Sequence, residues 1–248
     1  MIFVLGICGS PRKGNSYYLL EKALESAREV APKEVKTELY SVRGKKFAPC
    51  ISCFKCGELQ GECVIKDDFQ ELREKWVEAD VIIYSVPVYH MGIPAQLKAF
   101  IDRLGNSLFG RYSNLFPGEA KLPRSLKVIG AIAQGAHLYS GQEHTLTDLI
   151  NHALVMGCVP VTGDMWETYI GAGAWTYNDV GRNVLADKSE ESSLDMRVAL
   201  RGTASLARRA VELAIILKSG GKVEAKRLEV DPVYIPFLAR VRGEVTSQ

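Results

Sequence analysis

The fold of this chain of 248 residues is decided by its first stretch, Ile2-Phe3-Val4-Leu5-Gly6-Ile7-Cys8-Gly9-Ser10-Pro11-Arg12-Lys13-Gly14-Asn15-Ser16. The run 2–8 is apolar throughout, which is typical of a strand buried on both faces of a parallel sheet. The run 9–16 is rich in glycine and polar residues, and Tyr17-Tyr18-Leu19-Leu20 opens a helical pattern. The stretch therefore predicts a strand, a loop and a helix in succession.

The loop 9–16 carries groups that suit an anion. Gly9 and Gly14 permit sharp backbone turns, and the following helix presents unpaired N–H groups with a partial positive charge. The polar side chains available are those of Ser10, Arg12, Asn15 and Ser16. The spacing matches neither the dinucleotide-binding fingerprint nor the Walker loop. We therefore expect another type of phosphate loop, with an ordinary strand-to-helix turn as the alternative.

The composition is that of a soluble globular protein, with 47% hydrophobic and 24% charged residues. Lys and Arg number 31 against 29 for Asp and Glu, so bulk charge favours neither nucleic acid nor a membrane surface. No run reaches the roughly 18 consecutive apolar residues that cross a bilayer. The N-terminal apolar run enters the phosphate loop instead of a signal cleavage site. We expect a cytoplasmic protein with no nucleic-acid or membrane partner.

Strands and helices alternate along the chain. The apolar or alternating runs that predict strands cover 2–8, 35–40, 81–86, 125–133 and 158–163. Helices are predicted over 16–30, 67–78, 95–104, 194–218 and from the capping-box pattern Ser140-Gly141-Gln142-Glu143 to about 156. Five strands that alternate with helices predict an α/β fold with a doubly wound, five-stranded parallel sheet.

The remaining segments are expected to form loops of this domain and a C-terminal extension. The stretch 105–124 is polar and contains Gly and Pro, so we expect a surface insertion there, and 164–193 is expected to be a long loop. We predict one domain over 1–218, which includes a cysteine-bearing loop over 45–66 after the second strand. Residues 219–248 form a C-terminal extension, with a subunit interface as one possible contact.

In a doubly wound sheet, ligands bind beyond the carboxyl ends of the parallel strands. The loops after the first four predicted strands should therefore share one rim. These loops are 9–16, the cysteine segment within 41–66, 87–93 and 134–141.

Four cysteines lie within one short segment, in the pattern Cys50-x2-Cys53-x2-Cys56-x6-Cys63. In a cytosolic chain such a cluster points away from disulfides and toward metal or redox chemistry. Three cysteines at consecutive two-residue gaps favour an iron-sulfur cluster, whereas structural zinc sites usually use two separated pairs of ligands. Zinc stays as the less favoured occupant. The neighbouring lysines, expected to offset cluster charge, are Lys45, Lys46, Lys55 and Lys66.

Two further loops suit a planar ligand. The loop Pro87-Val88-Tyr89-His90-Met91-Gly92-Ile93-Pro94 offers exposed main chain, an aromatic ring and a thioether, which can read a heterocycle by hydrogen bonds and stacking. The loop 134–143 joins strand to helix through glycines and would supply another wall. The alternatives are plain packing of the following helix and an ordinary helix cap.

These motifs together resemble the iron-sulfur flavoproteins, a branch of the flavodoxin-like NAD(P)H-dependent FMN reductase superfamily. The resemblance rests on Gly-Ser-Pro-Arg-Lys-Gly-Asn-Ser at 9–16, Pro-Val-Tyr-His-Met-Gly-Ile-Pro-Ala at 87–95, the cysteines at 50–63 and Ser-Gly-Gln-Glu at 140–143. It covers about 1–163 and implies a flavodoxin-like fold. The longer segments at 105–124 and toward the C-terminus depart from the family pattern, as does Ser140 where relatives have glycine.

The resemblance also implies cofactors and residue roles. The FMN phosphate would be held by Ser10, Arg12, Asn15, Ser16 and Tyr17. The isoalloxazine ring would be lined by Pro87, Val88, Tyr89, His90, Met91 and Gly92, with Gln134 and Gly135 in the adjoining wall. A 4Fe-4S cluster would be ligated by Cys50, Cys53, Cys56 and Cys63. Relatives form dimers or tetramers, so a homodimer or homotetramer is expected.

The implied function is an oxidoreductase that passes single electrons from a donor such as ferredoxin through the cluster to FMN and on to a small acceptor. No acid-base catalytic residue is required, because the flavin does the chemistry. One alternative is an NAD(P)H-dependent FMN or quinone reductase with structural zinc in the cysteine loop. Another is a non-enzymatic electron carrier or redox sensor.

Two cysteines are expected to be buried and inert, and two histidines are expected to be structural or surface residues. Cys8 and Cys158 lie in predicted strands, where free cysteine is usually buried and inert. His144 and His152 lie on one predicted helix without a partner at metal-ligand spacing.

Overall fold

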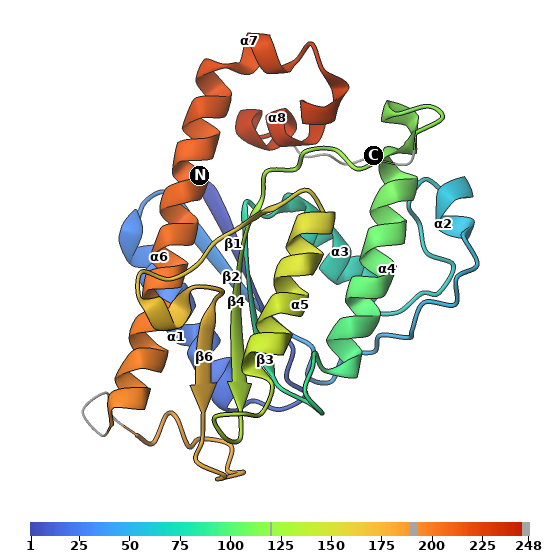
Figure 1. Ribbon diagram of the computed structural model, residues 1–248. Coiled ribbons are helices and arrows are strands. Elements are labelled where there is room, and N and C mark those ends of the chain that lie inside the picture. The colour runs from blue at the N-terminus through green and yellow to red at the C-terminus, as the bar shows by residue number, and fades with distance from the viewer. Residues whose placement is uncertain (120, 189–192, 245–248) are drawn as a thin grey trace.

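A parallel β-sheet runs through the centre of the molecule (Figure 1). The computed structural model describes residues 1–119, 121–188 and 193–244. The strands are β1 (Ile2–Cys8), β2 (Val35–Ser41), β3 (Val81–Pro87), β4 (Val128–Gly135), β5 (Val159–Pro160) and β6 (Ala172–Trp175). They follow the order β2-β1-β3-β4-β5, with β6 also paired to β4, and every pair is parallel. The predicted doubly wound α/β fold is confirmed.

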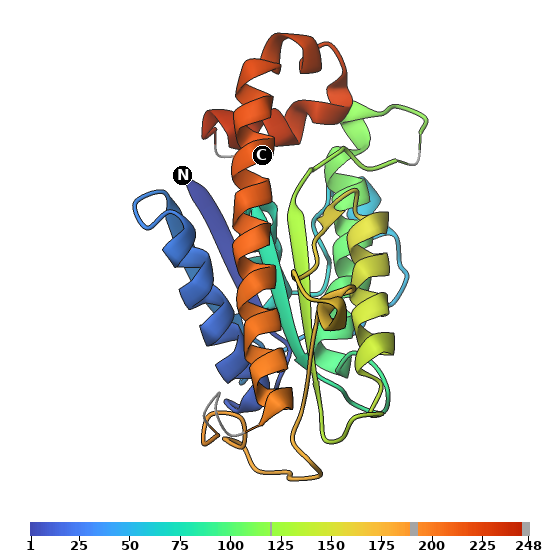
Figure 2. The ribbon, with the colours of Figure 1, turned by 60° about the vertical axis from the view of Figure 1, so that its left-hand side comes forward.

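Helices cover both faces of this sheet, as Figure 2 shows. The α-helices are α1 (Asn15–Val30), α2 (Lys55–Glu58), α3 (Phe69–Glu78), α4 (Ala95–Tyr112), α5 (Gln142–Val155), α6 (Leu194–Val223), α7 (Ala225–Leu228) and α8 (Ile235–Arg242). Helices α1 and α6 pack on one face, where Val4 and Ile83 belong to the core, and α3, α4 and α5 pack on the other, over Leu5 and Ile82. Neighbouring strand residues thus enter opposite cores, because successive side chains of a strand point to opposite faces.

The fifth strand position is divided between two short strands. β5 pairs with Val128 and Ile129 at the start of β4, whereas β6 pairs with the second half of β4, from Ile132 to Gly135. Between them the chain leaves the sheet and forms a 3-10 helix, η2 (Trp166–Thr168). β6 lies inside the predicted loop 164–193, so that prediction is wrong for these residues. Its sequence, Ala-Gly-Ala-Trp, lacks the β-branched residues by which strands are recognised.

Helix α4 is longer than the sequence pattern predicted. We expected it to end at 104 and to be followed by a surface insertion over 105–124, but it continues to Tyr112. Leu104 and Leu108 lie in the core on its inner face, which stabilises the additional turns. The irregular part begins only with the 3-10 helix η1 (Ser113–Leu115). Gly105 and Gly110, which suggested a loop, lie within the helix.

The C-terminal extension folds back over the amino ends of the strands, away from the strands' carboxyl ends (Figure 1). After α6 the chain forms α7, the 3-10 helix η3 (Pro232–Tyr234) and α8. The apolar side of α8 packs against Leu126, Leu228 and Tyr234, with Phe237 and Val241 at its centre. The extension therefore contacts its own chain, and a role at a subunit interface stays a prediction. Residues 245–248 of the extension lie outside the described residues.

A buried ion-pair cluster fixes the extension to the sheet. The Asp80 carboxylate, at the start of β3, pairs with Arg240 of α8 at 3.4 Å and with Lys218 of α6 at 3.0 Å. Its Oδ2 also accepts the backbone N–H of Phe3 at 3.0 Å. Buried charges are tolerated when they are paired and hydrogen-bonded in this way.

Among the described residues, no helix is long and apolar enough to cross a membrane.

Candidate functional site

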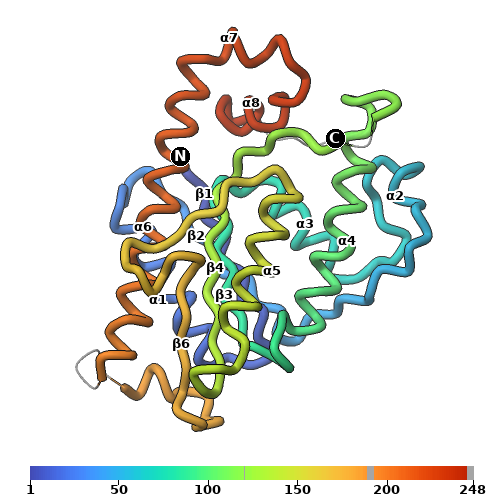
Figure 3. The backbone as a smooth tube through the Cα atoms, in the orientation of Figure 1, coloured from blue at the N-terminus to red at the C-terminus, as the bar shows by residue number. Residues whose placement is uncertain are grey.

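Three loops meet at the carboxyl ends of the parallel strands, at the lower end of the molecule in Figure 1. The backbone N–H of Gly9, just after β1, donates to the Ser85 carbonyl of β3 at 2.9 Å. The N–H of Val88, just after β3, donates to the Gln134 carbonyl of β4 at 2.8 Å. The register of the sheet thus places the loops 9–14, 88–94 and 136–141 side by side, as predicted for these three. The prediction that the cysteine segment shares this rim is wrong, because after β2 the chain leaves the rim and packs along α4 against Arg103, Asn106 and Gly110 (Figure 1 and Figure 3).

The phosphate loop joins β1 to α1 with buried hydroxyl groups beneath an exposed cation. Ser10 and Ser16 are 5% and 2% exposed, whereas Arg12 is exposed. The Ser10 hydroxyl accepts the N–H of Arg12 at 3.2 Å, which fixes the turn, and Ser85 donates to the Ser16 carbonyl at 2.7 Å. Tyr17 lies in the first turn of α1, with the Lys13 ammonium 4.8 Å from its ring centroid.

Asn15 has a different environment from the one that the sequence suggested. Its side-chain amide donates to the Gly181 carbonyl at 3.1 Å, and its Oδ1 accepts the N–H of Leu185 at 3.0 Å. Both polar atoms are therefore engaged by a segment far along the chain. A phosphate role for Asn15 stays a prediction, and the contact that the structure shows is with this segment.

That segment, residues 176–185, is called the strap. At one end, the N–H groups of Thr176 and Asn178 donate to the Ala136 carbonyl at 3.3 and 2.7 Å. At the other end it is held by Asn15, and it passes so close to the phosphate loop that a Cβ on Gly14 would lie 2.9 Å from the Arg182 carbonyl oxygen. The strap thus links two rim loops. It lies in the predicted loop 164–193, and its polar, aromatic composition was the available signal.

Arg182 places a further cation at the phosphate loop. Its backbone borders Gly14, and its side chain is exposed. In the described parts of the chain, its guanidinium has no hydrogen-bond or ion-pair partner within the protein. The sequence reasoning did not identify this residue, because only the fold brings it to the loop.

The loop after β3 has a strained, exposed tip. Tyr89 and Gly92 exchange backbone hydrogen bonds of 3.0 and 3.1 Å, and between them His90 and Met91 both have positive φ, 46° and 70°. Non-glycine residues adopt this left-handed region at a cost, and such strain gathers at functional sites. Tyr89 and Met91 are 43% and 51% exposed, so the tip presents an aromatic ring and a thioether to a ligand.

The loop after β4 supports this tip. Gly141 has φ of +100°, and a Cβ there would lie 2.8 Å from the Met91 Cα, so only glycine allows the two loops to touch. The predicted capping box is wrong. The Ser140 hydroxyl accepts the His137 N–H at 2.8 Å and donates to the His137 carbonyl at 2.6 Å, and α5 begins after Gly141. The residues expected to line a ring, Gln134 and Gly135, end β4 at this rim.

A cavity of about 560 Å³ opens beside the tip of the β3 loop. Its apolar and aromatic wall includes Met91, Leu138, Tyr139, Tyr169, Ile170 and Trp175. Glu143 lies on the same wall, where its carboxylate accepts the Tyr169 hydroxyl at 3.1 Å. The volume is in the range of small-molecule sites. The aromatic residues that form much of the wall lie in the predicted loop 164–193, so the sequence did not predict this cavity.

The cysteine segment follows β2 and docks on α4. All six cysteines are free thiols in the described chain, and Cys50, Cys53, Cys56 and Cys63 border one small hollow of about 30 Å³. The docking is close: a Cβ on Gly110 of α4 would lie 2.1 Å from the Cys56 carbonyl oxygen. Gly61 has φ of +92°, and a Cβ there would lie 2.7 Å from both the Arg111 Cβ and the Ser107 carbonyl oxygen.

Hydrogen-bond donors from α4 reach the thiols. Arg103 Nη2 lies 3.3 Å from the Cys63 sulfur, and Asn106 Nδ2 lies 3.8 Å from the Cys50 sulfur. In the described chain, no three Cys, His, Asp or Glu side chains converge on a single metal position. The donor set still fits a thiolate-ligated cluster, because four thiols border one hollow and N–H groups point at two sulfurs.

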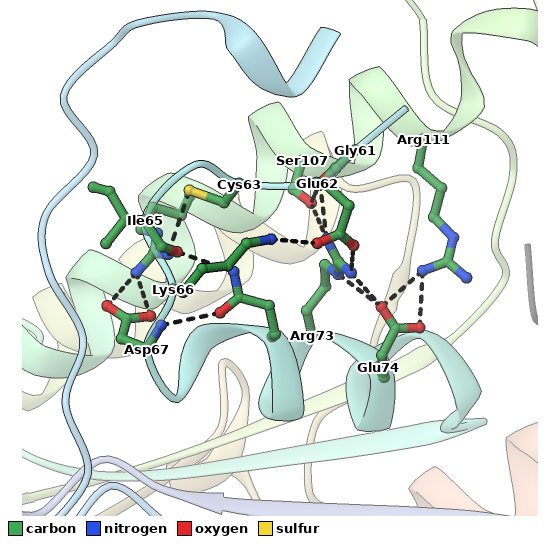
Figure 4. A network of polar contacts seen from close by, with 12 residues as sticks. Gly61, Glu62, Cys63, Ile65, Lys66, Asp67, Arg73, Glu74, Ser107 and Arg111 are labelled. Carbon is green, nitrogen blue, oxygen red and sulfur yellow. Dashed lines mark hydrogen bonds and ion pairs between the residues drawn. The ribbon is translucent and has the colours of Figure 1, made fainter. Parts of the chain in front are cut away.

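Buried arginines contact this segment in addition to the flanking lysines. Lys45 pairs with Asp68 and Glu71, Lys55 with Glu58, and Lys66 with Glu62. Figure 4 shows the network around the segment, in which Arg73 donates to the Gly61 carbonyl and Lys66 pairs with Glu62. Burial alone would raise the pKa of the Asp67 carboxyl, but the Arg103 hydrogen bonds and two backbone N–H groups lower it below its usual value.

The two cysteines and one of the two histidines that were expected to have no role in the chemistry are buried. Burial raises the pKa of Cys8 to about 11, and it raises the pKa of Cys158 as well, so both thiols stay protonated and unreactive. His152 is buried beside Tyr84, whose hydroxyl lies 3.2 Å from its Nε2, and burial lowers its pKa to about 4. His144 lies at the surface, 3.8 Å from Asp148.

Comparisons with known proteins agree with this site. The family described as NADPH-dependent FMN reductase matches residues 2–167. An iron-sulfur flavoprotein of Archaeoglobus fulgidus is 35% identical over 70% of this chain and 82% of its own length. Another, from Methanocaldococcus jannaschii, is 38% identical over 68% of this chain and 81% of its own. An FMN-dependent NADH:quinone oxidoreductase of Sinorhizobium fredii is 36% identical over 29% of this chain and 34% of its own.

Solved structures show the same fold at low identity. An azoreductase from Bacillus anthracis covers 84% of this chain and 100% of its own, with a TM-score of 0.57 and 18% identity. A flavone reductase covers 86% of this chain and 63% of its own, with a TM-score of 0.58 and 21% identity. At these identities the likeness establishes the architecture and nothing more.

Proposed function

This chain belongs to the iron-sulfur flavoproteins of the NADPH-dependent FMN reductase family, and from that premise we propose its electron donor, its cofactors and the route of the electrons to an acceptor. It is a flavin-dependent oxidoreductase. We propose that it takes single electrons from a protein donor such as ferredoxin, through a 4Fe-4S cluster, and delivers them from FMN to a small acceptor. The observation that carries the proposal is the common rim of the phosphate loop and the strained β3 loop.

FMN, when bound, supplies reversible two-electron chemistry, and the protein binds and orients it. In this proposal the phosphate is held by Ser10, Arg12, Ser16 and Tyr17, with Asn15 holding the strap. The ring is lined by the backbone and side chains of residues 87–92, with Gln134 and Gly135 beside them. The buried hydroxyls and the exposed Arg12 guanidinium support a dianionic ligand at the loop.

The cluster, when bound, supplies one-electron transfer. Its proposed ligands are Cys50, Cys53, Cys56 and Cys63, and the hollow that they border supports one shared occupant. The α4 helix then holds the ligand segment in place through the close contacts at Gly61 and Gly110.

The acceptor is proposed to enter the cavity beside Met91. Its apolar and aromatic wall favours a planar apolar molecule. The same surface exposes Tyr139 and Trp166, which are 84% and 93% exposed. Exposed aromatic residues of this kind support the expected homodimer or homotetramer, which sedimentation velocity would test.

The donor is tested by following flavin absorbance after anaerobic mixing of the holoenzyme with reduced ferredoxin or with NADPH. The proposal predicts rapid reduction by ferredoxin. In Cys53→Ser, ferredoxin should reduce the flavin at least tenfold more slowly, while the slower reaction with NADPH stays unchanged. Equal ferredoxin rates in the two proteins would contradict the route through the cysteine segment.

A second candidate is an NAD(P)H-dependent quinone reductase whose cysteine segment holds structural zinc. The match to FMN-dependent NADH:quinone oxidoreductase favours it, and four thiolates also satisfy tetrahedral zinc. Rapid reduction by NADPH, with no response to ferredoxin, would select this candidate. Absence of turnover with every donor and acceptor would instead select an electron carrier or redox sensor.

A further inference from the structure

Two buried arginines face the cysteine segment from neighbouring helices. Arg73 of α3 and Arg103 of α4 are 5% and 2% exposed. A buried guanidinium is tolerated only when carboxylates and carbonyls satisfy it. Arg103 donates to both carboxylate oxygens of Asp67 at 2.8 and 2.7 Å, and Arg73 pairs with Glu62 and with Glu74.

Arg103 contacts both ends of the cysteine segment. It donates to the Ala48 carbonyl at 3.3 Å, before the first cysteine, and to the Ile65 carbonyl at 2.8 Å, after the last. The same Nη2 that reaches Ile65 lies 3.3 Å from the Cys63 sulfur. The Phe69 ring, 4.2 Å from the guanidinium carbon, supports the side chain from behind. Its position is therefore set by several contacts at once.

Arg73 provides an internal comparison. It donates to the Gly61 carbonyl at 2.8 Å, where the Ser107 hydroxyl also donates. It thus supports the same segment and is equally buried. Within the described residues, however, none of its hydrogen bonds reaches a sulfur atom.

We propose that Arg103 is a positioning residue that raises the reduction potential of the cluster by donating a hydrogen bond to the Cys63 ligand. An N–H group directed at a ligand sulfur stabilises negative charge there, and one-electron reduction adds one negative charge to the cluster. The donor therefore favours the reduced state. Asn106, directed at the Cys50 sulfur from 3.8 Å, acts in the same sense but more weakly.

The proposal rests on the cluster assigned under the proposed function. Its test is an anaerobic redox titration of the holoenzyme, followed by the electron paramagnetic resonance signal of the reduced cluster, which separates it from the flavin. Arg103→Lys keeps the charge but cannot reach Asp67, both carbonyls and the sulfur together. We expect its midpoint potential to be more negative than that of the unmodified protein, while Arg73→Lys leaves the potential unchanged.

An Arg103→Lys protein that holds its cluster at an unchanged potential, or one shifted no further than in Arg73→Lys, overturns the proposal. If Arg103→Lys does not hold a cluster, Asn106→Leu decides: a smaller negative shift supports the proposal, and no shift overturns it. If the unmodified protein contains no iron and sulfide, the cluster itself is absent. That result refutes the proposed function, and not only the role of Arg103.

Discussion

Asn15 Oδ1 accepts a hydrogen bond from the Leu185 backbone N–H at 3.0 Å, across 170 positions of sequence. The same side chain donates to the Gly181 carbonyl, so one amide at the start of α1 binds two backbone positions near the end of the strap. The strap is held at its other end by the Ala136 carbonyl after β4. Hydrogen bonds through the strap therefore link the phosphate loop to the β4 loop. A substitution that breaks these bonds should weaken FMN binding.

Replacement of Asn15 by alanine should weaken FMN binding. Two hydrogen bonds to a partly buried backbone are lost, each contributing about 1 kcal/mol. We expect the dissociation constant of FMN, measured by flavin fluorescence with the apoprotein, to rise about tenfold. Asn183→Ala is the matched control, because Asn183 is an exposed strap residue. Its backbone carbonyl accepts a hydrogen bond that the substitution leaves in place. Equal affinities of the two variants would count against the coupling.

Gly141→Ala should disrupt the contact between the two ring-side loops. The substitution places a Cβ 2.8 Å from the Met91 Cα and forces alanine into φ of +100°. We expect a loss of about 2 kcal/mol in the free energy of unfolding, measured by urea denaturation. Gly220→Ala, in an open part of α6, should be neutral or stabilising by up to about 1 kcal/mol. Similar losses in both variants would contradict the close packing.

The buried His152 should make the protein sensitive to acid. Its pKa is about 4 in the fold, against about 6.5 when unfolded, so the unfolded state binds the additional proton between these values. Stability is unaffected above pH 6.5 and falls as the pH drops toward 4, by up to about 3 kcal/mol. His152→Leu should flatten this part of a plot of unfolding free energy against pH, whereas surface His144→Leu should not. An unchanged slope in His152→Leu would rule out this assignment.

Arg240→Met should destabilise the fold without altering FMN affinity. The guanidinium is buried between Asp80 and the Ser125 carbonyl, and its loss leaves Asp80 with Lys218 alone. We expect a cost of about 3 kcal/mol in urea denaturation. Arg242→Met removes an exposed pair with Glu229 and should cost less than about 1 kcal/mol. Weaker FMN binding in Arg240→Met would contradict the separation between this end of the sheet and the rim.

The sequence predicted the fold wherever burial leaves a trace in it, either an unbroken apolar run or apolar residues at regular spacing. The apolar runs of β1 and β3 were identified because parallel strands are buried on both faces. The loop after β1 was identified from its glycines and polar residues. β6 was missed, because a four-residue strand of small residues has no such trace. The same limitation applies to α4, where Gly105 and Gly110 suggested a loop although tertiary packing continues the helix.

The candidate site was predicted in part for the same reason. Residues within one loop, such as Ser10 and Arg12, were proposed from the glycine-rich, polar composition of that loop, and their contact with a ligand stays a prediction. Arg182 and Arg103 were not found, because the fold alone brings them to the phosphate loop and to Cys63. Asn15 was assigned to a ligand from its position in the loop, whereas the structure shows its amide bonded to a distant backbone.

The central claim is that this chain carries FMN and an iron-sulfur cluster together. It is tested most directly by purifying the protein without oxygen and measuring FMN, iron, acid-labile sulfide and zinc per chain. The account predicts about one FMN with about four iron and about four sulfide. One FMN with one zinc and no sulfide would contradict the cluster and make NAD(P)H the donor to test, and absence of FMN would contradict the whole account.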